Sequence, residues 1–403
     1  MQQMMANMGG GLDQNMMQQM MNNMGGTQAM NQNNPNSREG KAKERLRNKL
    51  AEKKKKRNLV VISLRGGMDG LSAVPPIDPK LEKFRPDILV KKTLPLTSDF
   101  ALHPSLKNFH NAWKQGKAAI VHATNIPYTM RSHFEGQDLM ESGGHKPFAE
   151  YTGWLGRGME TANLDGLAIA LPMPLILRSK ANLDNYFPTK LSTPSPDIMK
   201  RVASTYPEDS NLRSTIQRVI MRPYSMLSGK GSRKAHKLAG TAAKALSKAN
   251  GPRVAVFDIN GFDTHAAQGG SNGEHADKLY NLDKIFGTLQ KNLGPTYEDT
   301  LIVTLTEFGR KIEQNGGNGT EHGYGTAVLM IGGLVKKAQV YSDWPGLNRK
   351  NLFEGQDLNS TTDARSIYCS AMAMAFETDF EKLKRQVFWN DPLIDLQHKL
   401  FNI

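Results

Sequence analysis

The sequence predicts an α/β fold built on a doubly wound, mostly parallel sheet with helices on both faces. Six short apolar segments lack the polar–apolar alternation of half-exposed strands, which indicates strands that are covered on both sides. Helical segments fall between these strands, and strand–helix alternation is typical of this class. Five polar clusters lie beside strands, and a fold of this kind places its ligand site beyond the carboxyl ends of its strands.

The composition of the 403 residues narrows the class of protein. A hydrophobic share of 38% is enough for the core of one large domain or two. No apolar run reaches the roughly 18 residues that a membrane-spanning helix needs, which excludes such a helix. The single cysteine, Cys369, excludes a disulfide scaffold and a cysteine-based zinc site.

Residues 1–37 are rich in Met, Gln, Asn and Gly, and Asp13 is their only charged side chain. The segment is too poor in branched and aromatic residues to offset its ordering entropy, so we expect a disordered tail. Self-association through Gln and Asn is the alternative. Neither a continuous apolar signal segment nor a twin-arginine pair is visible, so a cytoplasmic location is the default expectation.

Residues 38–57 are strongly basic, with eleven Lys or Arg, three Glu and a net charge of +8. The segment therefore holds more than half of the chain's net charge of +14. We expect a basic helix or linker that is exposed to solvent. The alternative is contact with a polyanion, such as nucleic acid, anionic lipid headgroups or an acidic surface.

Residues 58–403 are expected to form the α/β domain, with a helical insertion at about 180–252, where no strong strand signal occurs. The expected strands are Leu59–Leu64, Ala118–Ala123, Leu167–Ala170, Val254–Ile259, Leu301–Leu305 and Ala327–Ile331. The expected helices are Pro104–Gln115, Phe134–Glu141, Asn211–Ile220, Lys234–Lys248, Glu274–Lys291 and Asp363–Ala375.

The first polar cluster, LRGGMDG, follows the first expected strand and contains Asp69. Gly66 and Gly67 allow a sharp turn that would leave the carboxylate uncovered, so Asp69 is a candidate metal ligand. An ordinary Asp-Gly turn is the alternative.

The second cluster, IPYTMRSHFEGQD, follows the expected strand at Ala118–Ala123. Thr129 and Ser132 are candidate nucleophiles. Arg131 and His133 could bind or protonate an oxyanion. The alternative is a helix start that is capped by Ser132 and a glutamate three residues later.

The last three clusters supply further candidate metal ligands. NGFDTHAAQ contains Asp263 and His265, and GTEHGYG contains His322. LTEFGR contains Glu307 and Arg310, which could instead form a surface ion pair. Carboxylate oxygens and imidazole nitrogens together suit a divalent metal such as zinc, manganese or iron better than calcium. For Asp263 and His265, the alternative is a capped helix start with a surface histidine.

Seven motifs in one order resemble the bacterial family known as domain of unknown function 1501. They are LRGGMDGLSAVPP, RSHFEGQD, TGWLGR, FDTHAAQ, LTEFGR, the H-G-x-G around His322, and VYSDWPGL. The resemblance extends from Asn58 to the C-terminus. That family is placed in the alkaline phosphatase and sulfatase superfamily, so the resemblance implies an alkaline phosphatase-like fold with a metal-centred site at the strand ends.

The resemblance also implies roles for single residues. Asp69 resembles the first metal-binding aspartate of the superfamily. His265, with Asp263 near it, resembles the Asp/His ligands that precede a helix. His322 resembles the last histidine ligand.

Ser132 or Thr129 occupies the region of the nucleophile that accepts phosphate or sulfate in the superfamily. Phosphatases have an Asp-His pair where this chain has Thr306-Glu307, so a complete two-metal set is not evident. Cys369 lies in CSAM rather than in C-x-P-x-R, which excludes a formylglycine sulfatase.

Together these observations lead to the hypothesis of a metal-dependent hydrolase that acts on small-molecule or polymeric phosphate or sulfate esters. Ser132 or a water would attack, while Arg131 and a divalent cation would stabilise the developing negative charge. The rival hypothesis is a non-catalytic binding or scaffold protein that keeps the fold and associates through its basic tail. The metal hypothesis predicts that Asp69, Asp263, His265, Glu307 and His322 converge in one pocket at the carboxyl end of the sheet. It fails if two or more of them lie on the opposite edge or are buried in separate environments.

Overall fold

The computed structural model describes residues 56–170, 172–188, 194–221 and 232–402. The expectations for the tail at 1–37, and nearly all of the basic segment at 38–57, lie outside the described residues. The α/β unit that carries the candidate site is Lys56–Ile403.

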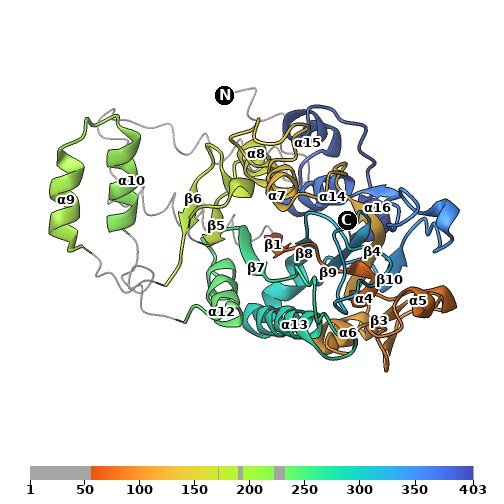
Figure 1. The fold of residues 1–403 in the computed structure, drawn as a ribbon. Helices are drawn as coiled ribbons and strands as arrows, with labels where there is room; N and C mark the ends of the chain where they lie inside the picture. The colour runs from red at the N-terminus through yellow and green to blue at the C-terminus, as the bar shows by residue number, and fades with distance from the viewer. Residues whose placement is uncertain (1–55, 171, 189–193, 222–231, 403) are drawn as a thin grey trace, which may run out of the picture. The chain divides into compact units, whose positions relative to one another are not determined.

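A nine-stranded sheet in the order β10-β4-β9-β8-β1-β7-β5-β6, with β11 pairing on β4, forms the centre of this unit (Figure 1). Its strands are β1 (Asn58–Arg65), β4 (Ala118–Asn125), β5 (Gly166–Ile169), β6 (Leu183–Asn185), β7 (Val254–Asn260), β8 (Thr300–Leu305), β9 (Thr326–Ile331), β10 (Gln339–Tyr341) and β11 (Thr362–Asp363). Strand β9 pairs antiparallel with β4 and β8, and every other pair in this sheet is parallel. A separate two-stranded antiparallel sheet joins β2 (Leu94–Pro95) to β3 (Ala101–Leu102).

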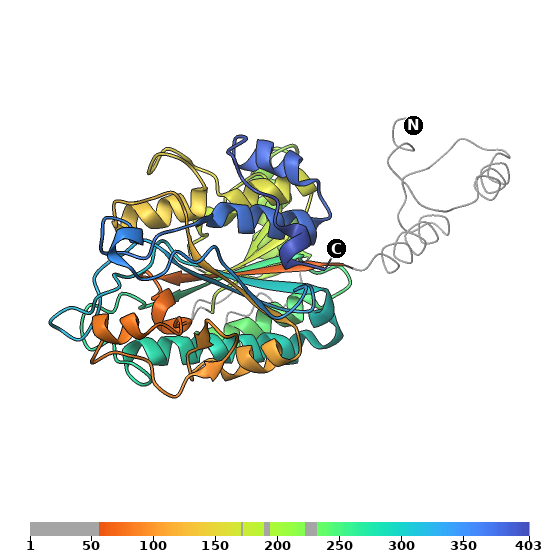
Figure 2. The same ribbon diagram turned by 90° about the vertical axis from the view of Figure 1, so that its right-hand side faces the viewer.

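Helices cover both faces of the large sheet (Figure 2). One layer holds α7 (His133–Ser142), α8 (Trp154–Ala162), α14 (Ala364–Phe376) and α15 (Phe380–Val387). The other holds α6 (Lys107–Lys114), α12 (Ala235–Leu246) and α13 (Glu274–Leu293). The other α-helices in the described part of the chain are α4 (Gly70–Ala73), α5 (Pro79–Phe84), α9 (Pro196–Ser204), α10 (Asn211–Ile220) and α16 (Gln397–Leu400).

Successive residues of β1 supply the two cores on opposite sides of the sheet. Leu59 and Val61 pack with the layer of α7 and α14, whereas Val60 and Ile62 pack with the layer of α12 and α13. Both sets are fully buried. This explains the apolar runs without alternation, because side chains of period two enter a core on either face.

The predicted fold class is confirmed, and each of the six expected strands and six expected helices is present with ends shifted by at most a few residues. The sequence did not predict β6, which is only three residues long, or α8 and α15. Within 180–252, α9 and α10 pack on each other, whereas α12 packs on α13 and on the sheet. No helix among the described residues combines the length and the apolar character needed to cross a bilayer.

Candidate metal centre

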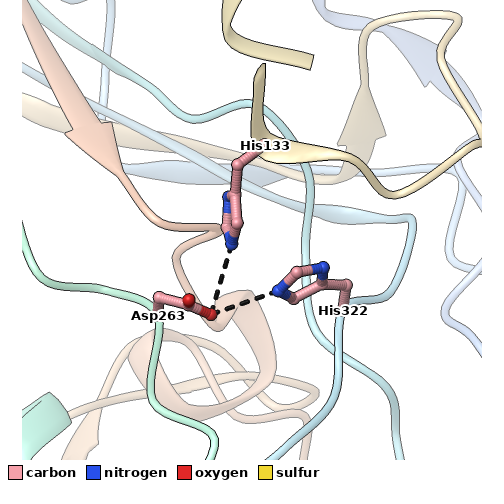
Figure 3. A group of neighbouring side chains, drawn as sticks. All are labelled: His133, Asp263 and His322. Atoms are coloured by element: carbon pink, nitrogen blue, oxygen red, sulfur yellow. Dashed lines mark hydrogen bonds and ion pairs between the residues drawn. The ribbon is translucent and has the colours of Figure 1, made fainter. Parts of the chain in front are cut away.

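One carboxylate oxygen, Oδ1 of Asp263, is surrounded by the Nε2 atoms of three histidines. The distances to this oxygen are 3.3 Å from His133, 3.0 Å from His265 and 3.2 Å from His322. Figure 3 shows His133 and His322 directing their rings at Asp263. The ligand atoms of His133, Asp263 and His322 all lie within 4.8 Å of one another. This spacing is small enough for a single ion to contact all three.

The sheet topology explains why these residues meet. His133 is the first residue of α7, beyond the carboxyl end of β4, and Asp263 and His265 lie in the loop after β7. His322 lies before β9 rather than after it. Because β9 runs against its neighbours, its start lies at the edge where the other strands end.

The imidazole of His133 is oriented by Glu307. Nδ1 of His133 lies 2.8 Å from Oε1 of Glu307, and the same oxygen accepts hydrogen bonds from Gly66 N and from Gln137 Nε2. A carboxylate at Nδ1 favours the tautomer that carries its proton there and leaves a lone pair on Nε2. Nε2 of His133 is also buried, and among the described residues it makes no hydrogen bond beside its 3.3 Å ion-pair contact with Asp263. Glu307 is therefore placed behind a ligand candidate, and we correct the expectation that it is itself a ligand.

The other two histidines are held in the same way. Nδ1 of His322 lies 2.8 Å from the carbonyl oxygen of Arg131, and Nδ1 of His265 lies 3.0 Å from Glu321 Oε2. All three rings therefore direct Nε2 towards Asp263. The Nε2 atoms of His265 and His322 are only 2.9 Å apart, and two lone pairs this close repel unless a proton or a cation lies near them. Nitrogen and oxygen donors of this kind fit a divalent transition metal.

Arg310 joins the loops that carry the cluster. Its guanidinium is buried, lies 2.5 Å from Asp263 Oδ1 and donates to the carbonyls of Gly66, Gly67 and Thr320. Burial would raise the pKa of Asp263, but hydrogen bonding and the charge of Arg310 lower it to about 2. Asp263 is therefore ionised at neutral pH, as a ligand or an ion-pair partner must be.

The histidines differ in their proton affinity. Burial lowers the pKa of His322, which favours the neutral ring that a metal requires. Burial also acts to lower the pKa of His133, but the hydrogen bond and charge of Glu307, together with the charge of Asp263, raise it above the ordinary value. Glu307 itself has a lowered pKa despite its burial, because it accepts hydrogen bonds from His133 and Gln137.

Asp69 does not join this cluster, and the expectation that it is a ligand is corrected. It is fully buried, and its Oδ2 accepts from Arg85 Nη1 at 2.6 Å, from Gln268 Nε2 at 2.6 Å and from Ser72 Oγ at 2.8 Å. Its Oδ1 accepts from Leu71 N as the N-cap of α4. Burial would raise its pKa, but the charge of Arg85 lowers it. Asp69 therefore stabilises the fold through these hydrogen bonds and its ion pair with Arg85.

Arg131 contributes to the site through its backbone. Its guanidinium is 2.6 Å from Asp357 and 2.5 Å from Glu354, so in this structure both acids already pair with the charge that was expected to face an oxyanion. The residue has a φ of 57°, an uncommon conformation for a side chain of this size, and its carbonyl meets His322.

Ser132 is the N-cap residue of α7, but its side chain makes no capping hydrogen bond. The capping box that was the alternative interpretation does not form, and Glu135 accepts a hydrogen bond from the hydroxyl of Tyr128 instead. The Ser132 hydroxyl thus stays next to His133 at a helix start. Sequence reasoning missed Gln137, although its spacing of four from His133 puts both on one helix face.

The family model of proteins of unknown function named DUF1501 matches residues 56–367 of this chain. No curated protein matches the chain by sequence. Solved structures with detectable similarity include a protein in the alkaline phosphatase superfamily from Vibrio parahaemolyticus, with 10% identity, 84% of this chain and 71% of that chain covered, and a TM-score of 0.42.

Another is the PsFucS1 sulfatase from Pseudoalteromonas sp., with 14% identity, 85% of this chain and 73% of that chain covered, and a TM-score of 0.39. Murine ectonucleotide pyrophosphatase/phosphodiesterase 5 has 10% identity, 86% and 100% coverage, and a TM-score of 0.41. Because the family model spans most of the chain, including all the residues around Asp263, the protein belongs to the DUF1501 family.

Proposed function

We propose that the protein is a metal-dependent hydrolase of phosphate or sulfate esters. The observation that carries the proposal is the convergence of three imidazole Nε2 atoms on one carboxylate oxygen, with each Nδ1 held by an oxygen acceptor. Histidines whose role is only packing or helix capping are not expected to share this arrangement. Metal-ligating histidines commonly have it.

His133, Asp263, His265 and His322 would hold the ion. A divalent metal there would supply positive charge next to the oxygen of a bound ester. The protein residues around it keep the ligands in place. Glu307, together with Glu321 and the Arg131 carbonyl, fixes the ring orientations, and a wrong tautomer would put a proton where a lone pair is needed.

Ser132 is the proposed nucleophile of this chain. It is the N-cap residue of α7, a helix of ten residues, and the backbone N–H groups at such a helix terminus favour an anionic group. In the proposed reaction the Ser132 oxygen bonds to phosphorus or sulfur as the ester bond breaks, and the hydroxyl proton of Ser132 leaves with the alcohol. Water then cleaves the serine ester, which releases phosphate or sulfate and restores the Ser132 hydroxyl. Water replaces Ser132 in the alternative form of the reaction.

Elemental analysis and an ester screen test the proposal. The purified wild-type protein is expected to hold a divalent metal and to cleave an aryl phosphate monoester, a phosphodiester or an aryl sulfate. His322→Ala should lose the metal and the hydrolysis while staying folded. His145→Ala is the matched control, since this histidine is mostly exposed and pairs with Asp391 instead. Ser132→Ala should abolish turnover only if the serine is the nucleophile.

A non-catalytic binding or scaffold protein is the second candidate. It is favoured by the ion pair between Arg310 and Asp263, because the guanidinium uses the same oxygen that the metal would need. A wild-type protein that holds no metal and cleaves none of the three esters would support this candidate and contradict the hydrolase.

A further inference from the structure

A groove of about 570 Å³ lies between α12 and α13, with one residue of α6 at its side. The two helices run next to each other on the face of the sheet that α6 also covers (Figure 1). None of the residues around Asp263 lines this groove. It is therefore a separate feature of the surface, and the inference drawn from it goes beyond the proposed hydrolase.

The two helices carry the same pattern, K-x-x-G-T-x-x-K. It reads KLAGTAAK from Lys237 to Lys244 in α12 and KIFGTLQK from Lys284 to Lys291 in α13. Seven residues are about two helical turns and about 10 Å, so both lysines of a pattern lie on one helix face. All four lysines line the groove, as do the glycine and threonine between them.

Small residues of the two helices face each other in the groove. A Cβ atom added to Gly240 would lie 3.6 Å from Thr288 Cγ2 on the facing helix. Glycine and threonine therefore line the middle of the groove, and each of the two helices contributes a pair of lysines to its lining.

The positive charge of the groove is not balanced. The four lysines are exposed, and none of them takes part in an ion pair found among the described residues. No Asp or Glu lines the groove. Asp283, next to Lys284, does not line the groove; it is buried and accepts hydrogen bonds from Asn108, which does line it, and from Phe109. Slight burial together with the charges of Lys284 and Lys237 lowers the pKa of His236, which also lines the groove.

We propose that this groove binds a narrow, flexible chain of phosphate groups, such as linear inorganic polyphosphate. Cations on both rims at a spacing of about 10 Å match a chain that carries several negative charges along its length. A flat anionic membrane would meet the helix surfaces and leave the groove floor uncovered. No Phe, Tyr or Trp lines the groove, so single-stranded nucleic acid would find no stacking partner inside it; exposed Tyr280, whose ring contacts Lys284, lies outside the lining.

The test measures polyphosphate binding to the full chain by titration, together with amine-reactive labelling read residue by residue by mass spectrometry. Orthophosphate at equal ionic strength is the comparison probe. The groove variant replaces four lysines by alanine: Lys237, Lys244, Lys284 and Lys291. The control variant removes four exposed lysines elsewhere: Lys83, Lys337, Lys350 and Lys382.

We expect the groove variant to lose about tenfold or more in affinity and the control variant to lose less than about twofold. In the wild type, polyphosphate should protect the four groove lysines from labelling, and orthophosphate should not. The labelling is position-specific, so binding at the basic segment 38–57 cannot imitate this result.

Three results would overturn the proposal. The first is protection confined to residues 38–57, and the second is an equal loss of affinity in both variants. The third is binding of phosphatidylserine vesicles or single-stranded DNA that depends on the same lysines while polyphosphate does not bind. That outcome would assign the groove to a membrane or to nucleic acid instead.

Discussion

Asp69 and Asp263 follow the carboxyl ends of two neighbouring strands, β1 and β7, yet the fold gives the two carboxylates opposite surroundings. Asp69 is fully buried and pairs with Arg85, which is also buried. Asp263 pairs with buried Arg310, but its side chain is 41% exposed and faces three imidazoles. A carboxylate at a strand end is therefore available for chemistry only if the core leaves one of its oxygens open to other donors.

The two aspartates also differ in what surrounds their partners. Arg85 donates to the carbonyls of Ile312 and Lys311 as well as to Asp69, so the pair joins β1 to a distant loop. Arg310 makes similar backbone contacts, but its acid lies at the surface of the sheet edge. The first pair stabilises the fold, and the second presents a charge to the candidate site.

The largest effect is expected from Asp69→Ala. Removing one partner leaves Arg85 buried without a counter-charge, which should lower the free energy of unfolding by about 3–5 kcal/mol. Denaturant unfolding measures this loss. Asp78→Ala is the control, since Asp78 caps α5 at the surface and should cost only about 1 kcal/mol. Equal losses in the two variants would contradict the structural role of Asp69.

Asp263→Asn should have a smaller effect on stability and a larger one on metal content. Arg310 loses its charged acceptor but keeps its carbonyl partners, so we expect a loss of about 1–3 kcal/mol. Elemental analysis should find the metal lost from the folded variant. Exposed Asp343, changed to Asn, is the control. Full metal content in Asp263→Asn would show that Asp263 is not a metal ligand and would contradict the contrast drawn with Asp69.

Lowering the pH should change the stability contributions of His122, which is buried near Asp69, and of His133, which contacts Asp263, in opposite directions. Burial lowers the pKa of His122 to about 4, and its Nδ1 accepts from Ala123 N. Below the unfolded pKa of about 6.5, the unfolded chain binds a proton that the folded protein excludes, so stability falls with pH. His133 has a raised pKa and acts in the opposite direction, adding stability below pH 6.5 or so.

The contribution of His122 is isolated with His122→Gln, which cannot titrate in this range. From pH 7 to pH 5 the wild type should lose about 2 kcal/mol of unfolding free energy relative to this variant. Denaturant unfolding at both pH values provides the measurement. A stability difference that stays constant between the two pH values would show that the pKa of His122 is the same in the folded and unfolded states.

The smallest effect is expected from Gln137→Ala, which removes a support of Glu307 without touching a candidate ligand. Stability should fall by about 1 kcal/mol, because the amide oxygen also accepts from Arg65 Nη1. Metal affinity should fall by about tenfold, since His133 loses part of what orients it. Gln386→Ala on the exposed side of α15 is the control. Unchanged metal affinity would show that Glu307 needs no support from Gln137.

The sequence alone was sufficient to predict the fold class. Burial of a strand or a helix face is recorded in the local pattern of apolar residues, so this pattern was enough to locate the six strands and six helices. The loops with Asp263, His265 and His322 could be picked out as well, because polar residues beside glycines at strand ends are visible locally. Short elements such as β6 were not predicted, because three residues are too few to show a recognisable pattern of apolar residues.

Only the tertiary structure decided which of these residues meet. Nothing in the sequence near β9 shows that it runs antiparallel, yet this direction brings His322 to the edge where Asp263 lies. Likewise, Asp69 and Asp263 have similar local sequences, and the difference comes from Arg85 and from Gln268, which is 199 residues away from Asp69. Side-chain pairing across such separations depends on strand order and packing, which no local pattern encodes.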